Sequence, residues 1–184
     1  MKKTLAAILL TCGLPLLAEE FTLELDPARS VVHYSLGDVL HSVHGTFKLK
    51  RGTIRFDPDT GKVGGEVIVD VASGYSNSHA RDRRMHKEVL QSDRFPEASF
   101  VPDKIEGKLS PEGDSKVGIH GLFKIHGEAH EVTLPSAVQI KGADVSATIH
   151  FSVPYVKWGM KNPSTFILRV ADHVEIDLLA VGRK

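Results

Sequence analysis

Apolar and polar residues alternate along most of this chain, and this pattern restricts the fold more than any other feature. Every second side chain of a β-strand lies on the same face, so alternation predicts strands with one apolar and one polar face. The run from 145 to 153 is the clearest example, and similar runs recur between 21 and 181. The sequence therefore predicts about eight to ten strands, paired antiparallel.

Most of the predicted strands are bounded by turn-forming residues. The run 57–61, Asp-Pro-Asp-Thr-Gly, is a strong turn signal, and we also place a turn at Arg51-Gly52. Pro135 interrupts an otherwise regular run and is typical of an edge strand or a bulge. The predicted strands cover residues 21–25, 32–36, 43–49, 54–56, 63–71, 100–109, 117–125, 132–140, 145–153 and 174–181.

One segment, from Ser78 to Phe100, breaks the alternation. Its apolar residues fall near helical spacing, and good helix formers dominate it. We expect Ser78 to cap this helix and Pro96 to return the chain to extended form. One short helix cannot cover both faces of a large sheet, so the strands must bury their apolar sides against each other. The prediction is a single all-β antiparallel domain, either a barrel or a two-sheet sandwich.

Residues 1–18 are predicted to be a secretory signal peptide and not part of the fold. Lys2 and Lys3 precede a short apolar run, and Ala18 marks the expected cleavage site. This run is too short to span a bilayer, so we expect no stable membrane insertion and a periplasmic or secreted protein, residues 19–184. A lipid attached at Cys12, the only cysteine, is the alternative.

Composition narrows the choice of partner. The 184 residues have a formal net charge of zero, with 41% hydrophobic and 25% charged residues, as in an ordinary globular protein. No long run of Lys or Arg appears, so nucleic acid is not expected as a partner. The sequence leaves the oligomeric state open, a homodimer included.

Several segments, taken in order, resemble the YceI-like family, also called polyisoprenoid-binding. They are Val43-His44-Gly45-Thr46-Phe47, Arg81-Asp82, Phe95-Pro96 with Phe100, the run 118–123 with Gly127, the run 156–160 and the final strand. This resemblance implies an extended lipocalin-like barrel of about eight strands with an elongated apolar cavity. It further implies an exported binding protein without catalysis or cofactor, which holds a long isoprenoid or a similar amphiphile.

The inward faces of the predicted strands supply candidate ligand-binding residues. We select ten of them and add Trp158, the only tryptophan, which would line a pocket mouth or plug the core. Small residues at inward positions, Gly45, Gly65, Gly121 and Ala147, either permit strand bending or leave room for a guest. The ten inward candidates are Val32, Tyr34, Phe47, Phe56, Val67, Val69, Ile119, Phe123, Ile149 and Phe151.

Other residues raise the question of an enzyme. Ten histidines invite a metal site, but His44, His120, His126 and His150 fall on the polar side of their runs, so we predict that they face solvent. No Gly-x-Ser-x-Gly motif is present. Arg81 and Asp82 are interpreted as an ion pair or cap that fixes the helix to the barrel rim.

Three hypotheses follow from these patterns. The first is a carrier that shields an apolar chain from water. The second is a hydrolase or metal-dependent enzyme acting on an amphiphile, which would need ionisable groups inside the pocket. The third is an interaction protein with a filled core. Arginines 81, 83 and 84 would suit a phosphate on the ligand, although adjacent helical positions point in different directions.

Overall fold

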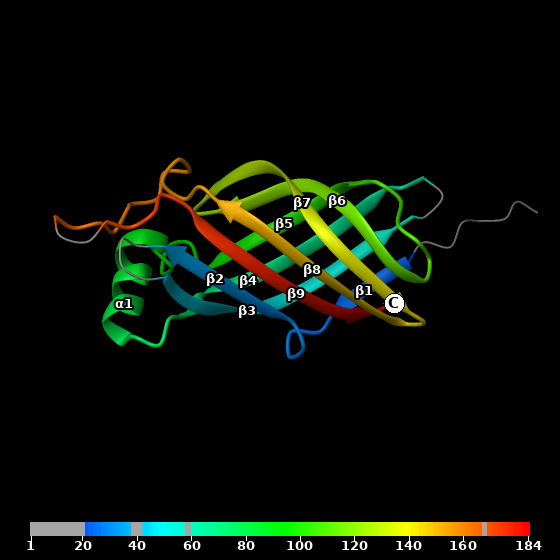
Figure 1. The fold of residues 1–184 in the computed structure, drawn as a ribbon, viewed down its shortest axis with the longest axis horizontal. Helices are drawn as coiled ribbons and strands as arrows, with labels where there is room; N and C mark the ends of the chain where they lie inside the picture. The colour runs from blue at the N-terminus through cyan, green and yellow to red at the C-terminus, as the bar shows by residue number, and fades with distance from the viewer. Residues whose placement is uncertain (1–20, 38–41, 58–59, 167–168) are drawn as a thin grey trace, which may run out of the picture.

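A computed structural model describes residues 21–37, 42–57, 60–166 and 169–184. The predicted signal peptide, its cleavage site and Cys12 lie outside the described residues. Within them, nine strands form one antiparallel sheet (Figure 1). The strands are β1 Phe21–Leu25, β2 Val31–Gly37, β3 Ser42–Phe56, β4 Val63–Tyr75, β5 Glu97–Glu106, β6 Gly113–Ile125, β7 Glu128–Lys141, β8 Asp144–Val153 and β9 Val174–Arg183.

The sheet closes into a barrel because β3 pairs with β4, so no free edge separates the two ends of the strand order. Strands β1 and β2 both pair with β3 on one side and β9 on the other. Because β1 and β2 share the same two neighbours, they lie end to end and together fill the place of one strand in the barrel wall. The nine described strands therefore form a barrel that is eight strands around. The predicted all-β, lipocalin-like antiparallel barrel of about eight strands is confirmed, and the two-sheet sandwich is not formed.

One helical segment lies across an end of the barrel (Figure 1). It consists of α1, His79–Arg84, and a wider π-helical turn η1, Met85–Leu90. The predicted helix is confirmed, and Ser78 is its N-cap residue as predicted, although the Ser78 side chain makes no capping bond. The predicted C-terminal end needs correction, because the helix ends at Leu90, well before Pro96. Gln91 ends it by taking a left-handed conformation, with φ of 47°.

The predicted turn at Arg51-Gly52 is wrong, because β3 runs through both residues. The pairing of β3 with β4 instead changes register between Leu49 and Arg51. Such a β-bulge inserts an extra residue and bends the strand without reversing it. A glycine next to a charged residue gives the same local signal for a bulge as for a turn, so the sequence alone misled us.

Pro135 lies at a ladder boundary of β7. The pairing of β7 with β6 continues past Pro135 without a register shift, whereas the pairing with β8 begins only at Ser136. A proline has no N–H to donate, so it fits where the strand has lost one of its neighbours. Of the two predicted explanations, the edge position applies and the bulge does not.

Some of the buried apolar side chains gather in two clusters. One contains Val117, Val138, Ile140 and Val145, and it lies at the end of the barrel away from the helix. The other lies at the helix end and is centred on Val153, Tyr155 and Met160.

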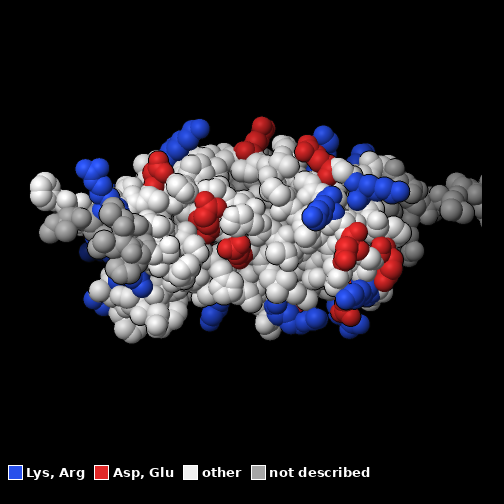
Figure 2. Space-filling view, viewed as in Figure 1, with Lys and Arg blue, Asp and Glu red and all other residues white. Residues whose placement is uncertain are grey.

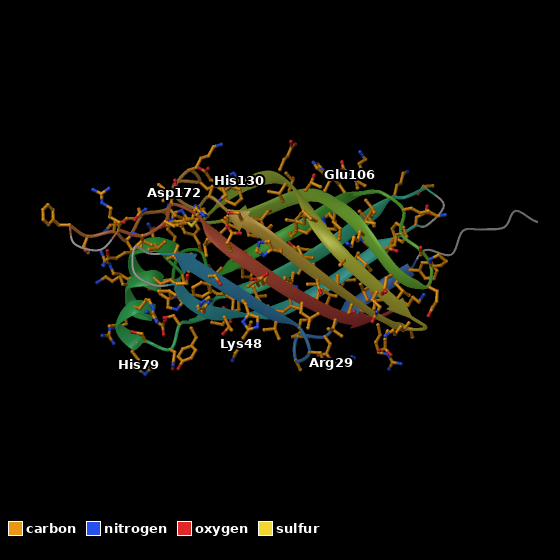
Figure 3. All side chains as sticks on the ribbon, in the orientation of Figure 1. Arg29, Lys48, His79, Glu106, His130 and Asp172 are labelled. Carbon is orange, nitrogen blue, oxygen red and sulfur yellow. The ribbon has the colours of Figure 1, made fainter. Side chains whose placement is uncertain are left out.

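The outer surface of the barrel carries many charged side chains (Figure 2), with a few exposed apolar ones such as Leu122 and Leu179. Acidic and basic side chains are interspersed over the face in Figure 2. Labelled side chains such as Arg29, Lys48 and Glu106 lie on the outside of the barrel (Figure 3). The barrel therefore presents charged and polar groups to water, while the apolar half of each strand faces inward.

Candidate ligand-binding cavity

The barrel interior contains a cavity of about 820 Å³. This volume falls in the upper part of the range of about 300–1,000 Å³ that is usual for small-molecule sites. Val89 and Leu90 of η1 line one end, and Pro111 and Lys184 line the other. These two ends lie at opposite extremes of the long axis (Figure 1), so the cavity extends along the barrel. The barrel interior is therefore not filled by side chains.

The structure places ten of the eleven predicted ligand-binding residues in the cavity lining. Each stands on the apolar side of its strand, as the alternation predicted. Two ring pairs stand out: Tyr34 and Phe47, with centroids 5.3 Å apart, and Phe123 and Phe151, at 5.8 Å in an edge-to-face arrangement. The ten are Val32, Tyr34, Phe47, Phe56, Val67, Val69, Ile119, Phe123, Ile149 and Phe151. Contact of any of them with a ligand stays a prediction.

Trp158 is not among the residues that line the cavity, so of its two predicted positions the packed one fits and the pocket mouth does not. Its indole stacks on the His130 ring, with centroids 4.0 Å apart and planes 5° from parallel. Phe123 lies between this pair and the cavity, with its ring centroid 6.0 Å from that of Trp158. Trp158 therefore packs behind the wall, where an aromatic ring gives a large apolar contact area. The sequence could not separate a wall position from a position behind the wall.

The small inward residues have two different roles. Ala147 lines the cavity, whereas the three glycines do not. A Cβ atom at Gly121 would lie 2.3 Å from the Val101 carbonyl oxygen of the neighbouring strand, and one at Gly45 would lie 2.4 Å from the Tyr34 ring. These glycines permit close approach of a neighbouring strand or ring, so only Ala147 contributes space for a guest.

The helix end of the cavity is held by a buried polar network. The Ser76 backbone N–H donates to the Asp82 carboxylate over 2.9 Å, and the Ser76 hydroxyl donates to the same oxygen. Arg81 donates from Nε to the Ser76 hydroxyl (2.8 Å) and from Nη2 to the Ser76 carbonyl (2.6 Å). Both helix residues thus bind the segment that follows β4. They fix the helix to the barrel rim as predicted, but through hydrogen bonds to Ser76 and not as the predicted ion pair or cap.

Two tyrosines in the lining have raised pKa values. Burial is the main cause of the raised pKa of Tyr34, whose hydroxyl lies 3.5 Å from the Met85 sulfur. Burial also raises the pKa of Tyr155 to about 12, and the nearby Asp172 carboxylate adds to this. The Tyr155 hydroxyl donates to the Ala171 carbonyl over 2.6 Å. Both side chains therefore stay neutral at physiological pH and add no charge to the cavity.

The described histidines stand outside the cavity. Several pair with outward-facing carboxylates: His120 with Asp103 at 2.6 Å, and His150 with Asp177 at 2.7 Å. The hydrogen bond from Asp103 is the main cause of a raised His120 pKa. His126 departs from the prediction, because it lies in the β6–β7 turn and not in a strand. Among the described residues, no group of three His, Cys, Asp or Glu side chains is arranged to hold a metal ion.

Sequence reasoning missed the residues that close the helix end. Met85, Val89 and Leu90 line the cavity from the helix, and Tyr155 and Met160 line it from the loop between β8 and β9. The apolar side of the predicted helix was a usable signal, since a helix at a barrel rim must turn that side inward. The loop residues follow no period, so no sequence pattern assigned them.

These features define the class of protein: a closed antiparallel β-barrel with an elongated apolar cavity and a helix at one end. Residues 23–181 match the YceI-like domain, so the chain belongs to the YceI-like family. A UPF0312 protein of Pseudomonas syringae pv. syringae is 26% identical over 153 residues, which cover 78% of this chain and 77% of the relative. A UPF0312 protein of Vibrio campbellii is also 26% identical, with 78% of both chains covered.

Solved structures share the fold. BcnA of Burkholderia cenocepacia superimposes with a TM-score of 0.71 at 22% identity, covering 85% of this chain and 98% of BcnA. A polyisoprenoid binding domain from Saccharophagus degradans, implicated in plant cell wall breakdown, gives a TM-score of 0.69 at 13% identity, with 88% and 97% covered. At these identities the likeness establishes the barrel alone. In the described part of the chain, the helical segments are too short to cross a membrane.

Proposed function

We propose that this protein is an exported carrier that holds one long-chain isoprenoid, or a similar amphiphile, in the barrel cavity. The observation that supports it most is the apolar cavity that extends along the barrel and is lined by inward-facing aliphatic and aromatic residues. Burying one methylene is worth about 0.8 kcal/mol, so an enclosed chain binds well with few polar contacts. Membership of a family that includes a polyisoprenoid binding domain agrees with this ligand class.

The chemistry of the lining favours binding over catalysis. Among the described residues, the lining contains no Asp, Glu, His or Cys side chain. General acid or base catalysis most often uses such a group, within hydrogen-bond reach of the reacting atom, and the one lysine of the described lining, Lys184, lies at the far end of the cavity. The tyrosines in the lining remain protonated at physiological pH, because burial raises their pKa values. A carrier is therefore preferred to a hydrolase or a metal-dependent enzyme.

Mass spectrometry of organic extracts tests the carrier directly. The protein is purified from its native host, with the variant Ala147→Phe prepared in parallel as a control with an obstructed cavity. We expect the wild-type extract to contain a long-chain isoprenoid or related amphiphile near one per barrel, and the variant extract to be depleted of it. Equal lipid in both extracts would mean that the lipid binds outside the cavity, and the carrier proposal would then be wrong.

Export is proposed from the sequence of residues 1–18. Lys2, Lys3, the following apolar run and Ala18 form the pattern of a cleaved leader. Intact-mass measurement of the protein from the native host is expected to give a chain that begins at Glu19. A lipid-modified chain that begins at Cys12 would instead place the barrel on a membrane by an anchor.

A further inference from the structure

The cavity is apolar along its length but carries positive charge at its ends. Among the described lining residues, the fixed charges are Arg81 and Arg84 at the helix end and Lys184 at the opposite end. No Asp or Glu of the described residues lines the cavity, and the carboxylate of Glu88, which pairs with Arg84, lies outside the lining. An apolar tunnel with cations only at its ends fits a ligand that has an apolar chain and an acceptor-rich head group.

Arg81 and Arg84 belong to one face of the helix. They are three residues apart, a spacing that places neighbouring side chains side by side, and both line the cavity. Arg81 and Arg83 are both exposed, but Arg83 lies on a different face of the helix and does not line the cavity. Two of the three arginines of this segment can therefore act on one group, while the third cannot.

The Arg81 guanidinium is held in place before any ligand arrives. Its hydrogen bonds to the Ser76 hydroxyl and carbonyl fix the plane of the group. The buried Ser76 is fixed in turn by Asp82, which is also buried. A guanidinium has more N–H donors than these two bonds use, and a group that is already ordered loses less entropy on binding.

Arg84 is only loosely engaged. Its Nε lies 3.7 Å from a Glu88 oxygen, beyond ordinary hydrogen-bond distance. That same oxygen accepts a closer bond, 2.7 Å, from the Lys161 ammonium. Lys161 therefore satisfies much of the charge of Glu88, and Arg84 can turn toward a ligand at little cost.

The opposite end offers a weaker anion site. Lys184 provides a single ammonium, which lies 5.0 Å from the centroid of the Phe21 ring. An ammonium is a point charge, whereas guanidinium forks match the paired oxygens of carboxylates and phosphates. The two ends of the cavity therefore carry different cationic groups, and only the helix end has two guanidinium groups.

We infer that Arg81 and Arg84 form a head-group site for a carboxylate or phosphate on the amphiphile, with the apolar chain directed along the barrel toward Lys184. This inference rests on the proposed carrier function and adds the class and the orientation of the ligand. Carboxylates and phosphates both offer paired acceptor oxygens to a guanidinium, so the site itself does not distinguish them. The experiment below uses one probe of each kind to tell which head group the protein binds.

The test compares matched probes that differ only in the head group. One pair is hexadecanoic acid and hexadecanol, and the other is geranylgeranyl phosphate and geranylgeraniol, each titrated below its aggregation limit into delipidated protein. Wild type should bind at least one anionic probe about tenfold or more tightly than its alcohol, the size expected for a charge-assisted hydrogen bond. The pair that shows the larger preference identifies the head group.

Variants assign the preference to the site. Arg84→Gln should reduce the preference for the anionic probe severalfold, and Arg81→Gln with Arg84→Gln should abolish it. Arg83→Gln, on the same helix but outside the lining, should leave it intact. Alcohol binding and the melting temperature control for damage to the fold, since Arg81 also binds Ser76.

The alternative outcomes have distinct meanings. Equal affinity of wild type for acid and alcohol would overturn the head-group site and leave the carrier intact. Loss of the preference in Lys184→Gln, with no loss in Arg84→Gln, would overturn the assignment to the helix end. Failure of wild type to bind any of the four probes, or any longer isoprenoid, would count against the carrier itself.

Discussion

Ala147 and Gly121 are both small inward-facing residues, but replacing each by a larger residue should affect protein stability in opposite ways. Ala147 faces the cavity, and its cross-strand neighbour Ala180 is equally small. Gly121 is packed against the adjacent strand, where an added Cβ would lie 2.3 Å from the Val101 carbonyl oxygen and 2.8 Å from the Pro102 Cα. We predict that the large change Ala147→Phe is tolerated, while the small change Gly121→Ala is not.

The expected magnitudes follow from these contacts. Gly121→Ala forces two backbones apart, and overpacking of this kind costs about 1–3 kcal/mol. For a domain of this size each kcal/mol shifts the melting temperature by about 2–4 °C, so we expect a fall of roughly 2–12 °C. In Ala147→Phe the ring enters an empty space of about 820 Å³ and gains apolar contacts. Its melting temperature should therefore equal or exceed that of wild type.

The assay combines thermal melts of delipidated protein with displacement of a fluorescent long-chain probe. Delipidation matters because bound ligand would raise the apparent stability of wild type alone. Ala147→Phe should lose most of the probe affinity while keeping its melting temperature, and Ala147→Leu should show an intermediate loss of affinity. If Ala147→Phe melts as early as Gly121→Ala, the space beside Ala147 is filled and the cavity is wrongly assigned.

Three further predictions concern single groups outside that comparison. Folding raises the pKa of Tyr155 to about 12, so its contribution to stability is intact below about pH 10 and is lost as pH rises through 12. Tyr155→Phe should flatten the alkaline limb of a denaturation series, and an unchanged limb would contradict the raised pKa. Asp103→Asn should lower the His120 pKa measured by NMR, because the Asp103 hydrogen bond is the main cause of its elevation. That interaction stabilises the fold fully below a pH of about 6.5 and is lost as pH rises through the folded-state pKa. Trp158 emission should change little on lipid binding, since it lies behind Phe123, and a large shift would place it in the cavity.

Much of the fold could be predicted because strand alternation is a local signal with a physical cause. A residue such as Phe151 lies on the apolar side of its strand in any antiparallel barrel, so its inward direction follows from the sequence alone. The bulge after Leu49 and the end of the helix at Gln91 depend on pairing and on a left-handed conformation that a non-glycine residue rarely adopts. These are set by tertiary contacts, so the local pattern misled us there.

The residues of the site likewise fall into some that could be predicted from the sequence and some that could not. The inward direction of the strand residues followed from the alternation, whereas the position of Trp158 stayed open between pocket mouth and core, because the loop that carries it has no period to fix its direction. The difference between Gly121 and Ala147 also could not be read from the chain. At Gly121 the backbone of the neighbouring strand occupies the space that a Cβ would need, whereas Ala147 lines the cavity.

The central claim is that an apolar chain lies inside the barrel, and paramagnetic NMR tests it most directly. A long-chain fatty acid that carries a nitroxide midway along the chain is added to protein with labelled methyl groups. Ile119, Leu134 and Ile149 line the cavity, while Leu122 and Leu179 are exposed on the outside, 43% and 41% accessible. We predict strong broadening of the inward methyl signals at one equivalent of lipid, with the outward leucines unaffected. Broadening of the outward leucines, with the inward methyls unchanged, would contradict it.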